Sequence, residues 1–140
     1  MKKIIVDDAE MTYTLEVDDN YKGFNYKVTH VIYKEASKGF KTNSIRFGWR
    51  CGYVRVQNIL DKIESNMPEV FNNIDSVELD FFGTLNRIDP KDDNKYIGFA
   101  CNHLFDTVEK CDTKFCINEC KKIIDQLIEI VGSDINGETR

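Results

Sequence analysis

The fold class is indicated first by residues 113–131, which have the sequence TKFCINECKKIIDQLIEIV. Apolar residues recur there at spacings of three and four, so they share one face of a helix. They are Cys116, Cys120, Ile123, Ile124, Leu127 and Val131. Thr113 is the expected N-cap and Gly132 the expected stop. Residues 133–140 are then expected to form a flexible tail.

The segments before this helix have the alternation and the β-branched content of strands. Residues 11–17, 24–33 and 45–56 predict an antiparallel meander, because their connections are too short for crossover helices. Residues 58–74 have helical spacing, interrupted by Pro68, and further strands are predicted at 77–83 and 96–101 around a polar loop at 89–94. The predicted fold is α+β: a mainly antiparallel sheet with a C-terminal amphipathic helix packed on it, in a single domain over residues 1–132.

Composition places the chain among globular proteins. Its 140 residues are 41% apolar and 31% charged, which suits one domain with its own core. The segment MKKIIV meets Asp7 and Asp8 too early for a signal peptide, and no apolar run approaches the ~18 residues of a membrane span. Five cysteines without a C-x-x-C pair predict neither a disulfide framework nor a zinc site. We therefore expect a cytoplasmic protein with no membrane contact, no metal and no cofactor.

The net charge of −5 hides an uneven distribution. Between Lys22 and Arg55 eight basic residues stand against the single acid Glu35, whereas acids outnumber bases from Asp61 onward. Aromatic residues interleave with these bases, at Tyr21, Phe24, Tyr26, Tyr33, Phe40, Phe47, Trp49 and Tyr53. Phosphates pair with Arg and Lys, and bases stack on aromatic rings, so the segment favours a nucleotide-like anionic ligand. The alternative is an ordinary sheet with aromatic residues inward and lysines outward.

Three blocks together resemble a family of small, largely uncharacterised proteins of phages and prophages. The blocks are GWRCGYV (48–54), FGTLN (82–86) and IGFACNHLFD (97–106), followed by a helix with Glu119-Cys120 and Gln126-Leu127. Phe82, Thr84 and Ala100 stand where that family has His, Gly and Asp. The retained set is Arg50, Cys51, Cys101, His103 and Asp106. In size and element order the chain is also similar to phage sponge proteins that sequester cyclic ADP-ribose signals, an analogy at fold level.

These observations lead to an expected function with named residues. We expect a non-enzymatic phage or prophage counter-defence protein, in the cytoplasm of the bacterial host, that binds and sequesters an anionic nucleotide-like small molecule. Arg46, Arg50 and Arg55 would hold phosphates, Trp49, Tyr53 and Phe82 would stack on the base, and Asn102 and His103 would contact its polar edges. On one regular strand Arg46 and Arg50 share a face and Arg55 points the other way.

Other interpretations stay open. The acidic second half would suit a protein–protein inhibitor of a host defence complex, or it is simply a solvated surface. Cys101, His103 and Asp106 have the residue types of a cysteine-dependent hydrolase, although a buried thiol and a hydrogen-bonded core histidine are the structural alternative. A C-terminal apolar stripe wider than the sheet can cover would also form a seam of a homodimer or a higher homo-oligomer.

Overall fold

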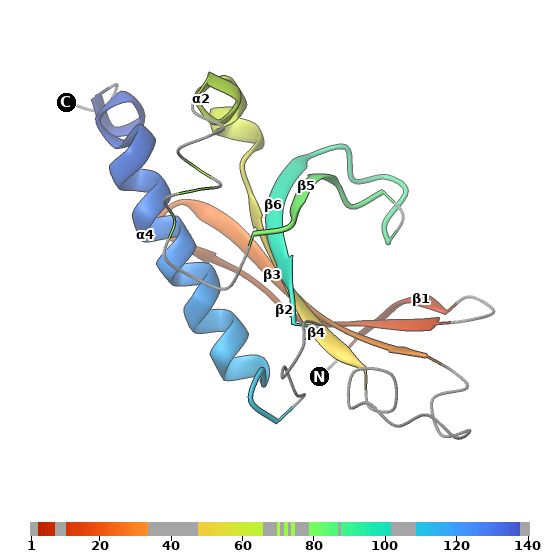
Figure 1. The fold of residues 1–140 in the computed structure, drawn as a ribbon. Helices are drawn as coiled ribbons and strands as arrows, with labels where there is room; N and C mark the ends of the chain where they lie inside the picture. The colour runs from red at the N-terminus through yellow and green to blue at the C-terminus, as the bar shows by residue number, and fades with distance from the viewer. Residues whose placement is uncertain are drawn as a thin grey trace.

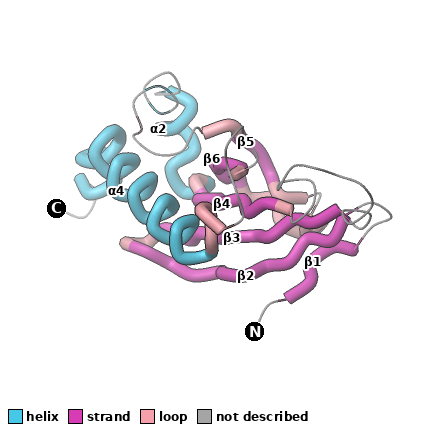
Figure 2. Tube along the Cα trace, turned by 60° about the horizontal axis from the view of Figure 1, so that its bottom comes forward, coloured by secondary structure: helices cyan, strands magenta, loops and turns pink. Residues whose placement is uncertain are grey.

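The chain folds into one antiparallel sheet with a long helix across one of its faces (Figures 1 and 2). The computed structural model describes residues 3–7, 11–33, 48–65, 79–86, 88–101 and 109–137, with the single positions Val70, Asn72 and Ile74. This arrangement confirms the predicted α+β class. Within the described residues, no helix has the length and apolarity needed to cross a membrane.

The sheet has six strands in the order β1-β2-β3-β4-β6-β5, and every neighbouring pair is antiparallel. The strands are β1 (Lys3–Asp7), β2 (Met11–Tyr21), β3 (Phe24–Tyr33), β4 (Trp49–Arg55), β5 (Phe81–Thr84) and β6 (Lys95–Ala100). The predicted meander of β2, β3 and β4 is confirmed, while β1 was not predicted. The predicted strand 77–83 corresponds to β5, which begins only at Phe81; residues 75–78 lie outside the described part.

Helices occur in two places, directly after β4 and after β6 near the C-terminus. A 3-10 turn, η1 (Gln57–Ile59), leads into α2 (Leu60–Ser65), so the helix predicted from residue 58 is confirmed as far as Ser65. The long helix α4 spans Thr113–Gly137. The expected stop at Gly132 is therefore wrong: a glycine inside a helix costs only about 1 kcal/mol, and α4 continues through it. The expected tail accordingly overlaps the last turns of α4.

The N-cap of α4 is also one residue earlier than expected. The backbone amide of Phe115 donates to Asp112 Oδ1 at 2.8 Å, which is the bond that an N-cap side chain accepts from the first turn. The Thr113 hydroxyl is not used as a cap and instead donates to Glu16 Oε1 at 2.8 Å. The prediction of Thr113 as N-cap is wrong, and Asp112 caps the helix.

The main core lies between α4 and the sheet. The predicted apolar stripe is confirmed at Ile123, Ile124 and Leu127, which are fully buried. Their partners on the strands include Phe24, Tyr26, Val28, Val54, Ile97 and Phe99. Burying one such side chain stabilises the fold by about 1.5–3 kcal/mol, so α4 and the sheet depend on each other.

One irregularity in β2 places a carboxylate in this helix-covered layer. The ladder between β2 and β3 shifts register between Leu15 and Val17, so Glu16 is the extra residue of a β-bulge. Glu16 turns toward α4, and its side chain is only 2% exposed. A regular strand of the predicted alternation would not aim this residue and Val17 at the same side.

Candidate ligand-binding face of the sheet

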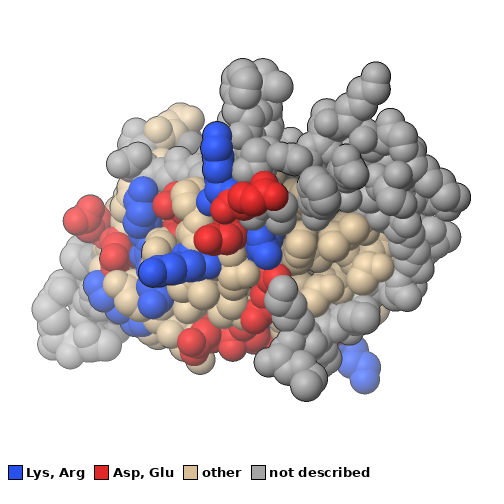
Figure 3. All heavy atoms as spheres, turned by 90° about the horizontal axis from the view of Figure 1, so that it is seen from below, with Lys and Arg blue, Asp and Glu red and all other residues tan. Residues whose placement is uncertain are grey.

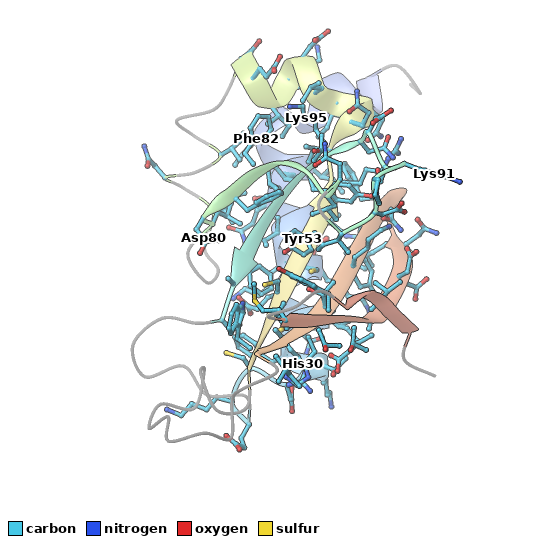
Figure 4. The ribbon with its side chains drawn as sticks, turned by 90° about the vertical axis from the view of Figure 1, so that its right-hand side faces the viewer. His30, Tyr53, Asp80, Phe82, Lys91 and Lys95 are labelled. Atoms are coloured by element: carbon cyan, nitrogen blue, oxygen red, sulfur yellow. The ribbon has the colours of Figure 1, made fainter. Side chains whose placement is uncertain are left out.

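The predicted binding residues of β4 are divided between the two faces of the sheet. Successive residues of a strand point to opposite sides. Val54 belongs to the core under α4, whereas Trp49 and Tyr53 pack with Cys51 on the other side. We call the side away from α4 the outer face; Tyr53 lies near its centre in Figure 4, with α4 behind the strands.

Arg55 belongs to the outer face and Arg50 to the helix-covered face. Arg55 and Tyr53 have the same parity in β4, while Arg50 Nε donates to the carboxylate of Glu16 at 2.7 Å in the layer beneath α4. The expectation that these two arginines point in opposite directions is confirmed. The expectation that both hold phosphates of one ligand is wrong, because the sheet separates them.

Arg50 is bound to elements of its own chain. Beyond its ion pair with Glu16, its Nη1 donates to the carbonyl of Cys111 at 3.2 Å, just before α4 begins. A guanidinium that already binds a buried carboxylate and a backbone carbonyl holds these parts of the chain together, so Arg50 is a structural residue. His30 also lies beside Glu16, with Nδ1 at 3.9 Å from Glu16 Oε2.

Phe82 faces the wrong way for the role predicted for it. It packs against the core under α4, and the Lys95 ammonium lies 5.7 Å from the centre of its ring. The neighbouring Phe81 takes the outer position instead: its ring makes an edge-to-face contact with Tyr53, with centroids 5.4 Å apart at 79°. Phe82 is therefore corrected to a core residue, and Phe81 is the aromatic neighbour that the sequence analysis missed.

The outer face carries a small apolar cluster of its own. Its buried members are Tyr13, Val31, Cys51 and Ile88, with Met11, Trp49, Tyr53 and Ala100 packed beside them. Ile88 comes from the connection between β5 and β6, which therefore folds back toward the strands. The Tyr53 ring fits closely over Gly98, where a Cβ atom would lie 2.7 Å from Tyr53 Cδ1. The outer-face cluster is thus a packed aromatic surface rather than a solvated one.

The polar groups of Tyr53, Cys51 and Thr29 lie close together within this outer-face cluster. Burial raises the pKa of Tyr53 well above its usual range, reinforced by the adjacent Cys51 and partly offset by Thr29. Burial likewise raises the pKa of the Cys51 thiol to about 11, although contacts with Tyr53 and Trp49 act against it. Thr29 is 1% exposed, and its Oγ1 has no partner with hydrogen-bond geometry among the described residues. Apolar walls with a few convergent polar groups are typical of small-molecule sites.

Cations gather at one end of the outer face. Lys27 is paired with Tyr53 across β3 and β4, and Arg55 is paired with Tyr96 across β4 and β6. Arg55 Nη2 donates to Asn94 Oδ1 at 3.0 Å. Lys27 contacts Asp18 at 3.2 Å and lies 5.5 Å from the centre of the Tyr96 ring. These contacts orient both cations and leave Arg55 with donors for a further acceptor.

The remaining predicted residues lie mostly outside the described part of the chain. Arg46, Asn102, His103 and Asp106 are among them. Cys101 is described and is 3% exposed in the core under α4, an environment in which a thiol is usually inert. In the described ranges, no group of three or more His, Cys, Asp and Glu side chains is arranged to hold a metal ion.

The charge asymmetry of the sequence does not persist as two single-sign regions on the side seen in Figure 3. Basic and acidic side chains intermingle over the described part of that side. One pair illustrates why: Lys22 contacts Asp125 at 2.8 Å, although the two residues are 103 positions apart in the sequence. Segments far apart in sequence bring opposite charges together when the sheet and α4 pack.

Comparison with known proteins adds no relative, since neither a family model nor a curated protein nor a solved structure matches this chain.

Proposed function

We propose that this protein binds an anionic, nucleotide-like small molecule on the outer face and sequesters it without chemistry. The observation that carries the proposal is that Trp49, Tyr53 and Arg55 share one side of β4. Aromatic rings on this surface can stack on the base of a nucleotide, and the guanidinium can bind its phosphate.

The order of these residues along β4 suits an elongated ligand. Trp49 stands at one end, Tyr53 and Cys51 in the middle and Arg55 at the other end. At ~3.3 Å per residue this run covers about 20 Å. Stacking of a base on an aromatic ring contributes about 1–3 kcal/mol, and a charge-assisted bond from Arg55 would fix the opposite end.

The biological role extends the resemblance to phage and prophage proteins. A protein that holds a signalling nucleotide tightly lowers its free concentration by stoichiometry alone, which would blunt a defence response in the bacterial host. A homo-oligomer would multiply the sites on each particle. We do not favour the alternative of a protein–protein inhibitor, because acids such as Asp18, Asp92 and Asp125 make contacts within their own chain.

Thermal unfolding with a ligand panel tests the proposal. The panel contains the four nucleoside 5′-monophosphates, ADP-ribose, cyclic ADP-ribose and cyclic dinucleotides. A ligand at 100 times its Kd stabilises the folded protein by ~2.7 kcal/mol, a readily measured shift. The expected result is a shift that Arg55→Gln and Trp49→Leu reduce.

The matched control is Lys95→Gln, which removes a cation whose side chain lies on the other side of the sheet beside Phe82. Its ligand-induced shift should equal that of the wild-type protein. Absence of a shift with every member of the panel would contradict the proposed function.

A further inference from the structure

The Thr29 hydroxyl is a polar group buried without a partner beneath the candidate binding face. Threonine hydroxyls at 1% exposure are normally hydrogen-bonded, because a buried hydroxyl without a partner destabilises the fold. Thr29 Oγ1 has no such bond among the described residues. A buried group of this kind calls for a physical reason, and a ligand that completes the bond is one.

The surroundings of Thr29 place it inside the candidate site. Thr29 is directly opposite Cys51 in the β3–β4 ladder, and Lys27, two residues earlier on the same side, is opposite Tyr53. The Tyr53 side chain lies near both Cys51 and Thr29, and its contact with Thr29 lowers the pKa of Tyr53 without reaching hydrogen-bond geometry at Thr29 Oγ1. The hydroxyls of Thr29 and Tyr53 therefore lie together between the Trp49 end and the Arg55 end of the outer face.

We propose that the hydroxyls of Thr29 and Tyr53 are the specificity-determining groups of this site and bind the hydrogen-bonding edge of a heteroaromatic base. The inference rests on the proposed function and adds which part of the ligand is recognised, and by which residues. Each hydroxyl can donate one hydrogen bond and accept another, which matches the donor and acceptor of an amide-like base edge. Arg55 and Lys27 are left for the phosphate.

Thr29 is only 1% exposed, so a ligand can reach it only after side chains on the outer face move. Tyr53 is partly exposed, and its ring lies over Gly98 of β6 and makes an edge-to-face contact with Phe81 of β5. Rotation of this ring away from Gly98 and Phe81 would offer the ring face to the entering base on the same face of the sheet as Thr29.

Substitution of Thr29 by valine separates stability from binding. Thr29→Val replaces an unsatisfied hydroxyl by a methyl group, so the Tm of the ligand-free protein should rise. Affinity for the tightest-binding nucleoside 5′-monophosphate should fall about tenfold, the usual weight of one hydrogen bond to a ligand. Affinity for ribose 5-phosphate, which has no base, should not change. Thr29→Ser keeps the hydroxyl and should bind as the wild type does.

Tyr53→Phe supplies a second, independent variant in case Thr29→Val does not fold. It retains the ring and should weaken nucleotide binding without affecting ribose 5-phosphate. Unchanged nucleotide affinity in both variants would overturn the inference while leaving the proposed function standing. An equal loss of affinity for ribose 5-phosphate would also overturn the inference. A lower Tm for Thr29→Val with unchanged nucleotide affinity would overturn it too, because that result indicates that a structural water binds the Thr29 hydroxyl. If the wild type binds no member of the ligand panel, both proposals fail.

Discussion

Arg50 Nε lies 2.7 Å from Glu16 Oε1, and this pair of side chains from β4 and β2 also bonds to the beginning of α4. The same Glu16 oxygen accepts from the Thr113 hydroxyl at 2.8 Å, and Arg50 Nη1 donates to the Cys111 carbonyl. A carboxylate near the N-terminus of a helix is further favoured by the helix dipole. Arg50 therefore stabilises the architecture from the side opposite the candidate ligand.

Glu16→Ala should be among the most destabilising single substitutions in this chain. It leaves the buried Arg50 guanidinium without its carboxylate, a loss that typically costs about 3–5 kcal/mol. Urea unfolding followed by circular dichroism measures the change as a lower midpoint. The control is Lys22→Asn, which breaks the exposed pair with Asp125 and keeps a residue that tolerates the positive φ of 52°. That variant should lose little stability, because exposed ion pairs contribute little; equal losses for the two variants would contradict the assigned role of Glu16.

Gly52→Ala should destabilise the protein by about 1–3 kcal/mol through overpacking. A Cβ atom at this position would overlap the Phe99 ring and lie 2.9 Å from Cys120 Sγ, so strand β4 would have to move away from α4. Gly83→Ala is the comparison, because its new methyl would meet the Phe81 ring at ordinary contact distances, 3.6 Å from Cζ and 3.9 Å from Cε1. Thermal unfolding of both variants tests this, and a Gly52→Ala protein as stable as Gly83→Ala would refute the close packing.

The five cysteines should resist Ellman's reagent in the folded protein at pH 8. All five are free and buried, and burial raises the pKa of Cys51 to about 11. At three pH units below that value only on the order of one thiol in a thousand is ionised, and the thiolate is the reactive form. In urea all five should react. Rapid reaction of one thiol in the native protein would reveal an activated cysteine and revive the hydrolase interpretation.

Asp92 should contribute stability that disappears in acid. Burial alone would raise its pKa, but hydrogen bonds from Tyr96 and Asn94 outweigh it, so the pKa of Asp92 lies below the ordinary 3.8. Its contribution is complete above pH 3.8 and is lost as the pH falls through the lowered folded-state pKa. Tyr96→Phe removes the 2.8 Å bond to this carboxylate. The variant should show a flatter decline of unfolding free energy below pH 4; an identical decline would exclude this coupling.

Periodicity predicted the elements well, since it reports which residues share a face within one segment. The stripe of α4, the meander of β2, β3 and β4 and the opposed directions of Arg50 and Arg55 follow from spacing alone. The end of α4 did not, because a single glycine weakens a helix without ending it.

Which residues form the candidate site depends on how the strands pair, and strand register is not readable from a single sequence. The choice between Phe81 and Phe82 is set by the register of β5 on β6, in which Phe81 is opposite Gly98 and Phe82 opposite Ile97. Thr29 carried no signal of its own, because a threonine in a strand is ordinary and its missing partner is visible only in three dimensions. The partner of Arg50 was hidden by the bulge at Glu16.

That bulge also explains how two tyrosines of one strand serve opposite layers. Tyr13 and Tyr21 are eight residues apart, and in an uninterrupted strand they would point to the same side. The extra residue reverses the alternation halfway along β2. Tyr13 therefore joins the outer-face cluster, while the Tyr21 hydroxyl donates to Asp125 of α4 at 3.3 Å. Deleting Glu16 would restore regular alternation and move the side chains of one half of β2 to the opposite face of the sheet. The number of residues in this strand is therefore as strictly constrained as their identity.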